Sequence, residues 1–303
     1  MHSVRPPKHH NTASAFAVAT LGIASFSAMD ALMKGLSLSI GTYNALLWRT
    51  LAGAAIGGAV FFARRTPWPG PEAMRLHLKR GILGAVIAVF FFWGLARVPM
   101  AQAIALAFIS PIIALYLAAV LLGERIAKGA IFASLFGFAG VIVILAGQAK
   151  AELGPEAMLG SASILVAACC YAYNIILMRQ QAQAAGPVEI AFFISLIMTA
   201  CFLLAAPFMA VLPPAGEWPE IGLAAVLALL SLLLLAWAYA RTEAQYLAPV
   251  EYTGFVWAAL FGYLIFAEEV APLTYAGATM IVAACLVAAR QKPVSMAELE
   301  AGL

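Results

Sequence analysis

The second half of the sequence repeats a series of residues from the first half in the same order. Each of the two copies is long enough to contain an odd number of membrane-spanning segments. A Trp-x-x-x-Arg pattern at Trp93 and Arg97 returns 144 residues later at Trp237 and Arg241. The other matched positions are Met33-Lys34 with Met178-Arg179, Gly41 with Gly186, Ala101-Gln102 with Ala244-Gln245, Glu124 with Glu268, and Ala139-Gly140 with Ala276-Gly277. If each copy contains five spans, the second copy must enter the membrane from the opposite side. Such inverted repeats are typical of transporters that alternate access around a midplane site.

The composition indicates a membrane protein. Hydrophobic residues make up 64% of the chain and charged residues 10%, with a mean hydropathy of +0.97, whereas about a quarter of a soluble domain is charged. Apolar runs of about 17–25 residues can cross a hydrocarbon core as helices. We expect ten such spans, the third of which is short and extends toward Arg80 or Arg97: 13–34, 43–62, 81–96, 100–122, 127–146, 157–178, 188–211, 221–240, 244–267 and 271–289.

The sequence therefore predicts an all-α integral membrane protein of ten transmembrane helices, arranged as two inverted five-helix repeats. Residues 1–150 form the first repeat with its N-terminal tail, and residues 151–303 form the second repeat with its C-terminal tail.

Positive residues fall mainly on the side of the membrane that holds the N-terminus. Thirteen lie there: Arg5, Lys8, Arg64, Arg65, Arg75, Lys79, Arg80, Arg125, Lys128, Arg179, Arg241, Arg290 and Lys292. The other side holds Arg97, Lys150 and, at a helix end, Lys34. This bias predicts that both termini are cytoplasmic. The net charge of +3 reflects these loops and does not suggest a nucleic-acid partner.

Neither a metal site nor a disulfide framework is expected. All four cysteines, Cys169, Cys170, Cys201 and Cys285, lie within predicted spans and have no metal-ligand spacing. Disulfide frameworks form in oxidising aqueous compartments, so these cysteines are expected to be packing residues. The four histidines lie outside the predicted spans, and no cofactor is expected.

A few ionisable residues lie within spans, where a charge is costly and therefore marks a functional candidate. Asp30 and Lys34 are four residues apart on the first span and share one face. Arg49 lies about two turns into the second span. The three could form a structural ion-pair cluster that positions the two helices, or a gating or substrate-binding network.

Glu251 lies about 12 Å into the ninth span from its cytoplasmic end, at about 1.5 Å per residue. Its neighbours are polar, aromatic or helix-breaking: Gln245, Tyr246, Pro249 and Tyr252. Glu251 is either a buried carboxylate that hydrogen-bonds to tyrosine or backbone, or a group that binds a substrate ammonium or carries a proton.

Aromatic and polar residues supply further candidates for the substrate pathway. Trp93 and Trp237 either belong to interfacial aromatic belts or close the two mouths of a central pathway. The remaining candidates for its lining are Gln102, Ser110, Tyr171, Asn174 and Tyr239.

Proline, glycine and two glutamates suggest local structure. Pro111 is expected to kink the fourth span, and Pro249 is a second hinge candidate. The pairs Gly53 with Gly57 and Gly137 with Gly140 predict close helix packing. Glu124 and Glu268 follow apolar runs and are expected to cap the start of the next helix.

These residues resemble the EamA repeat of the drug/metabolite transporter superfamily from about Ala13 to Ala289. The matching positions are Arg49, Trp93, Arg97, Pro99, Ala101, Ser110-Pro111 and Leu122-Gly123-Glu124-Arg125. The second half departs from the pattern, with Ala267 in place of glycine before Glu268 and Thr253-Gly254 in place of Ser-Pro. The resemblance implies a ten-helix carrier of the bacterial inner membrane, with two inverted five-helix repeats around a central cavity. It is most similar to bacterial exporters of amino acids, the aromatic ones in particular.

The expected function is export of amino acids and related metabolites by alternating access, with the small molecule and the lipid bilayer as partners. Few fixed charges and many aromatics suit a zwitterion with an apolar side chain, whereas a sugar phosphate would need clustered intramembrane Arg or Lys. A carrier of quaternary amines, nucleosides or cofactor-like metabolites is the alternative, and a scaffold or sensor a further one.

Motifs of intramembrane enzymes and the GxxxxGK[ST] loop of ATPases are absent from the sequence. A monomer is expected, with a dimer as the alternative; proton coupling and facilitated diffusion both remain open.

Overall fold

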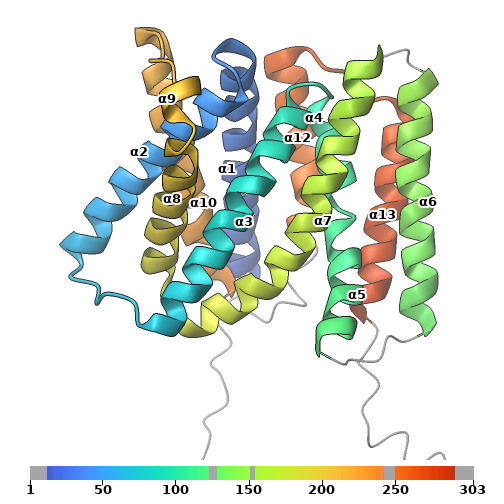
Figure 1. Cartoon of the computed structure of the whole chain (residues 1–303). Coiled ribbons are helices and arrows are strands. Elements are labelled where there is room, and N and C mark those ends of the chain that lie inside the picture. The colour runs from blue at the N-terminus through green and yellow to red at the C-terminus, as the bar shows by residue number, and fades with distance from the viewer. Residues whose placement is uncertain (1–11, 123–127, 151–153, 240, 242–249, 291–303) are drawn as a thin grey trace, which may run out of the picture.

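The computed structural model describes residues 12–122, 128–150, 154–239, 241 and 250–290, and within these ranges every regular element is helical (Figure 1). The first half contains α1 (Thr12–Ser39), α2 (Thr42–Ala63), α3 (Pro71–Leu95), α4 (Met100–Ala107), α5 (Ser110–Leu122) and α6 (Lys128–Lys150). The second half contains α7 (Gly154–Ala184), α8 (Pro187–Leu203), α9 (Ala206–Met209), the 3₁₀ turn η1 (Ala215–Glu217), α10 (Trp218–Tyr239), α12 (Thr253–Phe266) and α13 (Pro272–Arg290).

Every predicted span contains a helix, and five helical segments are long and apolar enough to cross a membrane by themselves. These are Ser14–Ser39, Thr42–Ala63, Pro71–Leu95, Gly154–Ala184 and Ala215–Ala238. The other predicted spans coincide with shorter apolar helices, among them Pro187–Leu203 and Thr253–Phe266. The all-helical membrane architecture is thus confirmed, whereas the full count of ten spans stays a prediction.

The predicted start of the third span was wrong. Helix α3 begins at Pro71, after Gly70, rather than near residue 81. Proline suits the first helical position because its fixed φ is preorganised and its missing N–H would be unpaired there anyway. As a result, His77 and Arg80 lie inside a helix that is apolar enough to span the membrane, although both were placed outside the spans.

The expected kink at Pro111 appears as a complete break between two helices. Helix α4 ends at Ala107 and α5 begins at Ser110, whose hydroxyl donates a hydrogen bond of 2.7 Å to the Ala107 carbonyl. A proline ring clashes with the carbonyl four residues before it, which for Pro111 is that of Ala107. The sequence therefore breaks this span where the ring requires it.

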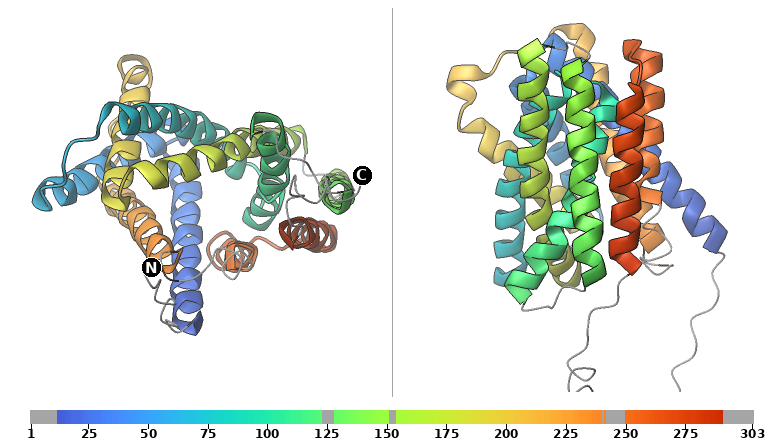
Figure 2. Two further views of the ribbon diagram at one scale, coloured as in Figure 1. Left: turned by 90° about the horizontal axis from the view of Figure 1, so that it is seen from below. Right: turned by 90° about the vertical axis from the view of Figure 1, so that its right-hand side faces the viewer.

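The two halves contact each other through matching helix pairs. In chain order, α1, α2, α3, α4–α5 and α6 correspond to α7, α8, α10, α12 and α13. The largest contacts are α6 with α13, α1 with α10, α3 with α7, and α2 with α8. Exchange of the halves converts the α1–α10 contact into the α7–α3 contact and leaves the α6–α13 and α2–α8 contacts unchanged. Figure 2 shows α6 and α13 side by side.

Glycines allow these pairs to approach closely. A Cβ atom at Gly140 would lie 2.7 Å from the Gly277 carbonyl oxygen, and one at Gly277 would lie 2.5 Å from that of Gly140. These glycines are equivalent in the sequence repeat, so equivalent positions of the two halves face each other. The predicted packing role is confirmed at Gly53, Gly57 and Gly137 as well. A Cβ atom at these positions would lie 3.1 Å from Ser195 Oγ, 3.2 Å from Phe192 Cα and 2.5 Å from Ile112 Cδ1, respectively.

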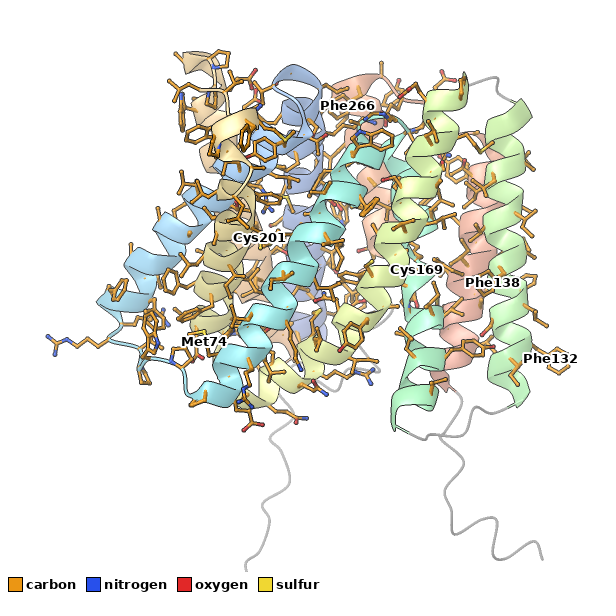
Figure 3. All side chains as sticks on the ribbon, in the orientation of Figure 1. Met74, Phe132, Phe138, Cys169, Cys201 and Phe266 are labelled. Atoms are coloured by element: carbon orange, nitrogen blue, oxygen red, sulfur yellow. The ribbon has the colours of Figure 1, made fainter. Side chains whose placement is uncertain are left out.

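Large apolar side chains cover the outside of the bundle as well as its core. Phe132 on α6 points away from the other helices (Figure 3), and 71% of its surface is exposed. An apolar exterior is favourable in a bilayer, where lipid rather than water surrounds the helices. The four cysteines are free thiols on α7, α8 and α13.

Candidate functional site

A group of charged side chains surrounds Tyr171, which lies in the middle of α7. Asp30 on α1, Arg80 on α3 and Glu251 just before α12 all act electrostatically on the Tyr171 hydroxyl. The tyrosine nevertheless keeps 40% of its surface accessible. The structure thus brings Tyr171 and Glu251, both predicted from the sequence, together with Asp30.

Asp30 and Arg49 form the most deeply buried part of this group. Asp30 is 1% exposed, and neither of its carboxylate oxygens has a hydrogen-bond partner among the described residues. The Arg49 guanidinium on α2 acts electrostatically on Asp30, and its Nε is also unpaired within the described part. Asn174, one turn beyond Tyr171 on α7, has an unpaired buried Oδ1 as well. These polar atoms are unpaired in the interior, where a polar ligand could satisfy them.

The prediction that Lys34 belongs to the same network as Asp30 and Arg49 was wrong. Lys34 Nζ donates hydrogen bonds to Glu268 Oε1 and, at 2.6 Å, to the Val98 carbonyl. Glu268 Oε2 accepts a hydrogen bond of 2.8 Å from the Met100 amide, at the first residue of α4. We call Lys34, Val98, Met100 and Glu268 the Lys34 cluster. The first amides of a helix have no intrahelical partner, and a carboxylate there is favoured by the helix dipole.

The turn after α12 aims Glu268 at this cluster. Ala267 adopts a left-handed conformation with φ 53° and ψ 34°. The Ala267 amide donates to the Tyr263 carbonyl at 3.1 Å, and the Glu268 amide donates to the Gly262 carbonyl at 3.0 Å. A left-handed residue commonly ends a helix in this way, and glycine is the usual residue at that position. Glu268 therefore caps a helix, as expected, but the helix is α4 of the other half rather than the next one in the chain.

A second buried cluster joins α3 to the second half of the chain, and the sequence reasoning did not find it. Arg80 Nη1 donates to Gln181 Oε1, Gln181 Nε2 donates to His77 Nδ1 at 2.6 Å, and His77 Nε2 donates to Glu189 Oε1 at 2.9 Å. We call these four residues the His77 cluster. A guanidinium can only donate and a carboxylate can only accept, so the two ends of the cluster define the direction of every hydrogen bond. His77 and Arg80 are three residues apart, about one helical turn. A correct prediction of the start of α3 would have placed both on one face of a membrane helix and indicated the cluster.

The repeated Trp-x-x-x-Arg pattern forms the same structure in both halves. The Arg97 guanidinium stacks 3.6 Å from the Trp93 ring centroid and donates to the Trp93 carbonyl at 3.0 Å. Arg241 lies 4.0 Å from the Trp237 ring and donates to the Trp237 carbonyl at 3.1 Å. Cation–π contact and hydrogen bond together orient each tryptophan at its helix end. Whether the two rings close a pathway or lie in aromatic belts stays a prediction.

Some of the other predicted pathway residues contact neighbouring helices, and some lie outside the described residues. Gln102 is buried and donates to Ser161 Oγ at 3.2 Å, while Ser110 bonds to its own helix break. Tyr252 packs edge-on against Phe108, with ring centroids 5.3 Å apart. Tyr239 is the last residue of α10. Gln245, Tyr246, Pro249 and Glu124 lie outside the described residues.

Comparison with known proteins gives a consistent family. Residues 13–146 and 158–290 match the EamA-like transporter family, once for each half. The chain is 28% identical to the pseudopaline exporter CntI of Pseudomonas aeruginosa, over 91% of this chain and 95% of that protein. It is 29% identical to a riboflavin transporter of Rhizobium johnstonii, over 72% of each chain.

Two further similarities agree. The aromatic amino acid exporter YddG of Ancylobacter novellus is 28% identical over 59% of this chain and 70% of its own length. One solved crystal structure superposes with a TM-score of 0.59 at 20% identity, covering 91% of this chain and 96% of the other, which supports the fold. The chain therefore belongs to the EamA-like transporter family of the drug/metabolite transporter superfamily, and is a multi-pass membrane transporter of small molecules rather than an enzyme.

Proposed function

We propose that the chain exports amino acids or related zwitterionic metabolites, aromatic ones among them, by alternating access across the bacterial inner membrane. The observation that carries this proposal is the mixed charge around Tyr171, where Asp30 and Glu251 provide negative charge and Arg80 provides positive charge. A zwitterion needs one partner of each sign, because burial of an unpaired charge is costly. The interior does hold Arg49 and Arg80, but Asp30 acts electrostatically on Arg49. A single arginine that is not matched by acid does not suit a dianionic phosphate.

In this proposal Glu251 binds the substrate ammonium, and Asp30 is the candidate proton carrier. Trp93 and Trp237 would close the two mouths of the pathway, and the break at Pro111 would act as a hinge. A single chain contains both halves of the pathway, so we propose that the monomer is the transporting unit.

The helix contacts support an inverted arrangement of the two halves. Contacts are preserved when the halves are exchanged, and the equivalent residues Gly140 and Gly277 touch each other, as expected beside a local two-fold axis. Helix α1 begins and α13 ends at the same end of the bundle (Figure 1). With the excess of Lys and Arg in the loops at that end, the proposed orientation has both termini in the cytoplasm.

The relatives support export but differ in their named substrates. Two are named exporters, one for pseudopaline and one for aromatic amino acids. Others are named riboflavin transporters and an S-adenosylmethionine uptake transporter. The second candidate function is therefore transport of a cofactor-like metabolite.

Uptake by proteoliposomes tests the proposal. Purified protein is assayed with a panel of labelled amino acids, with and without a proton gradient, and with riboflavin as a separate substrate. The variant Glu251→Gln is compared with Glu269→Gln, which makes the same change at an exposed residue. Saturable amino acid uptake that is lost only in Glu251→Gln is expected. Saturable riboflavin uptake without any amino acid uptake would favour the second function.

A further inference from the structure

Arg80 is a positive charge inside the bundle that has no acidic hydrogen-bond partner in the described part of the chain. It lies nine residues from the start of α3, about 14 Å along the axis at about 1.5 Å per residue. Among the described residues it is bonded only to the neutral side chain of Gln181, and its buried Nε has no partner. A guanidinium offers five N–H donors. Arg80 therefore has N–H donors that can bind a ligand, in a region where an unpaired charge is costly.

The rest of the His77 cluster orients Arg80 without neutralising it. Glu189 accepts from His77, which holds His77 Nδ1 as an acceptor for the Gln181 amide nitrogen. The Gln181 amide oxygen must then face Arg80. The acid of the cluster is thus kept two side chains away from the guanidinium. By contrast, Arg97 pairs directly with Glu156 at 2.9 Å near the bundle surface.

The sequence repeat does not require this arrangement. With the offset of 144 that relates Trp93 to Trp237, the positions equivalent to His77 and Arg80 are Ile221 and Ala224. With the offset of 145 that relates Met33 to Met178, those equivalent to Gln181 and Glu189 are Leu36 and Asn44. Ile221, Ala224 and Leu36 are apolar and buried. One half of the molecule therefore builds the fold at this position without an arginine, so Arg80 is not a requirement of helix packing.

We propose that Arg80 binds the carboxylate of the transported substrate, and that Gln181, His77 and Glu189 are its positioning residues. The guanidinium is within electrostatic range of Tyr171, and so are Asp30 and Glu251. A substrate beside Tyr171 would place its carboxylate at Arg80 and its ammonium toward the two acids. Arginine suits this role because its planar fork can bind a carboxylate through two hydrogen bonds. This assignment rests on the proposed function and adds the group that recognises the acid end of the substrate.

The test compares binding of an amino acid with binding of its carboxamide, which lacks the carboxylate. Labelled L-phenylalanine and L-phenylalaninamide, or the equivalent pair for the amino acid that the wild-type protein takes up best, are bound to purified full-length protein. The variants are Arg80→Gln, Arg80→Lys and Gln181→Glu. The control is Lys79→Gln, which removes the neighbouring exposed positive charge. Gln181→Glu keeps the size of the side chain and the acceptor for Arg80, but supplies the internal carboxylate that the wild-type cluster withholds.

Loss of a charge-assisted hydrogen bond corresponds to a change of roughly tenfold or more in affinity. Arg80→Gln and Gln181→Glu should therefore weaken binding of the amino acid by that factor and leave binding of the carboxamide unchanged. Arg80→Lys should retain part of the preference for the acid, and Lys79→Gln should retain all of it.

Two results would overturn the assignment. If Arg80→Gln weakens the amino acid and its carboxamide equally, or weakens neither, Arg80 does not recognise the carboxylate although the protein remains an amino acid carrier. If the wild-type protein binds and transports no amino acid, the proposed function fails and this assignment fails with it.

Discussion

The Lys34 cluster and the His77 cluster lie at opposite ends of the bundle and join the two halves of the chain in different ways. Figure 3 labels a residue near each, Phe266 beside the first and Met74, one turn before His77, beside the second. In the Lys34 cluster, opposite charges meet directly and a helix N-terminus completes the site. In the His77 cluster, two neutral side chains separate the cation from the anion.

The two clusters also differ in how the sequence repeat treats them. Lys34 and Glu268 have charged equivalents, Arg179 and Glu124, in the other half. Ile221 and Ala224 stand where the His77 cluster has His77 and Arg80. The sequence therefore repeats the charged residues Lys34 and Glu268 in both halves, but has His77 and Arg80 in one half only. Among the described residues, Arg80 of the His77 cluster is bonded to a neutral side chain rather than to an acid. We therefore assign substrate recognition to Arg80 and stabilisation to the Lys34 cluster.

The largest effect is expected from Glu268→Ala. This change leaves the Lys34 ammonium buried without its partner and the Met100 amide uncapped. Removal of one member of a buried ion pair costs about 3–5 kcal/mol, and the Lys34 and Glu268 side chains are only 5% and 16% exposed. Thermal unfolding in detergent should show a large decrease that the exposed control Glu269→Ala does not share. Equal unfolding temperatures for the two variants would remove the stabilising role from the Lys34 cluster.

A smaller effect is expected from Gly140→Val. Gly140 lies at the contact between the two halves but belongs to neither the Lys34 cluster nor the His77 cluster. The new Cβ would lie 2.7 Å from the Gly277 carbonyl oxygen, and overpacking of this kind costs about 1–3 kcal/mol. Gly222→Val is the control, because a Cβ at Gly222 would have no neighbouring atom within 4 Å. If both variants unfold at the same temperature, the close α6–α13 contact does not contribute to stability.

Glu189→Gln tests whether the charge of the acid matters less for stability in the His77 cluster than in the Lys34 cluster. Glutamine still offers an oxygen to His77, so only the charge of the acceptor is lost. Hydrogen bonds to charged groups exceed neutral ones by about 1 kcal/mol, so the decrease in unfolding free energy should be well below that for Glu268→Ala. A decrease as large as that for Glu268→Ala would mean that the His77 cluster is primarily a stabilising ionic device.

The smallest effect, and the only stabilising one, is expected from Ala267→Gly. Ala267 is held at φ 53°, where an L-residue is strained by about 1–2 kcal/mol and glycine is not. The greater freedom of glycine in the unfolded chain offsets about 0.5–1 kcal/mol of this gain, so a net increase of up to about 1 kcal/mol should appear in the unfolding temperature. Ala271→Gly, outside the left-handed region, is the control. A decrease in Ala267→Gly would show that the turn before Glu268 is not strained.

Several parts of the structure could be predicted because each depends on local chemistry. Continuous apolar runs identified the helices, and Pro111 identified the break between α4 and α5. Glycine spacing identified the close contacts, including that of Gly140. The start of α3 was misplaced because Arg75, Lys79 and Arg80 were read as loop charges, although the proline at position 71 already supplied a helix start.

The partners of the charged residues could not be predicted in the same way. Asp30 and Lys34 share a helix face in sequence, yet Lys34 pairs with Glu268, more than two hundred positions away. Helical spacing reports which residues lie on one side of one helix, but not which other helix packs there.

The sequence by itself determined the class of the protein, its helices, its duplicated halves and its family, because hydrophobic length and repeated motifs are properties of a linear chain. The tertiary structure alone decided which charges meet. It paired Lys34 with Glu268, separated Arg80 from Glu189 by two neutral side chains, and gathered Asp30, Arg80 and Glu251 around Tyr171. Electrostatic interaction depends on distance and burial, and both are defined only once helices from the two halves have packed together.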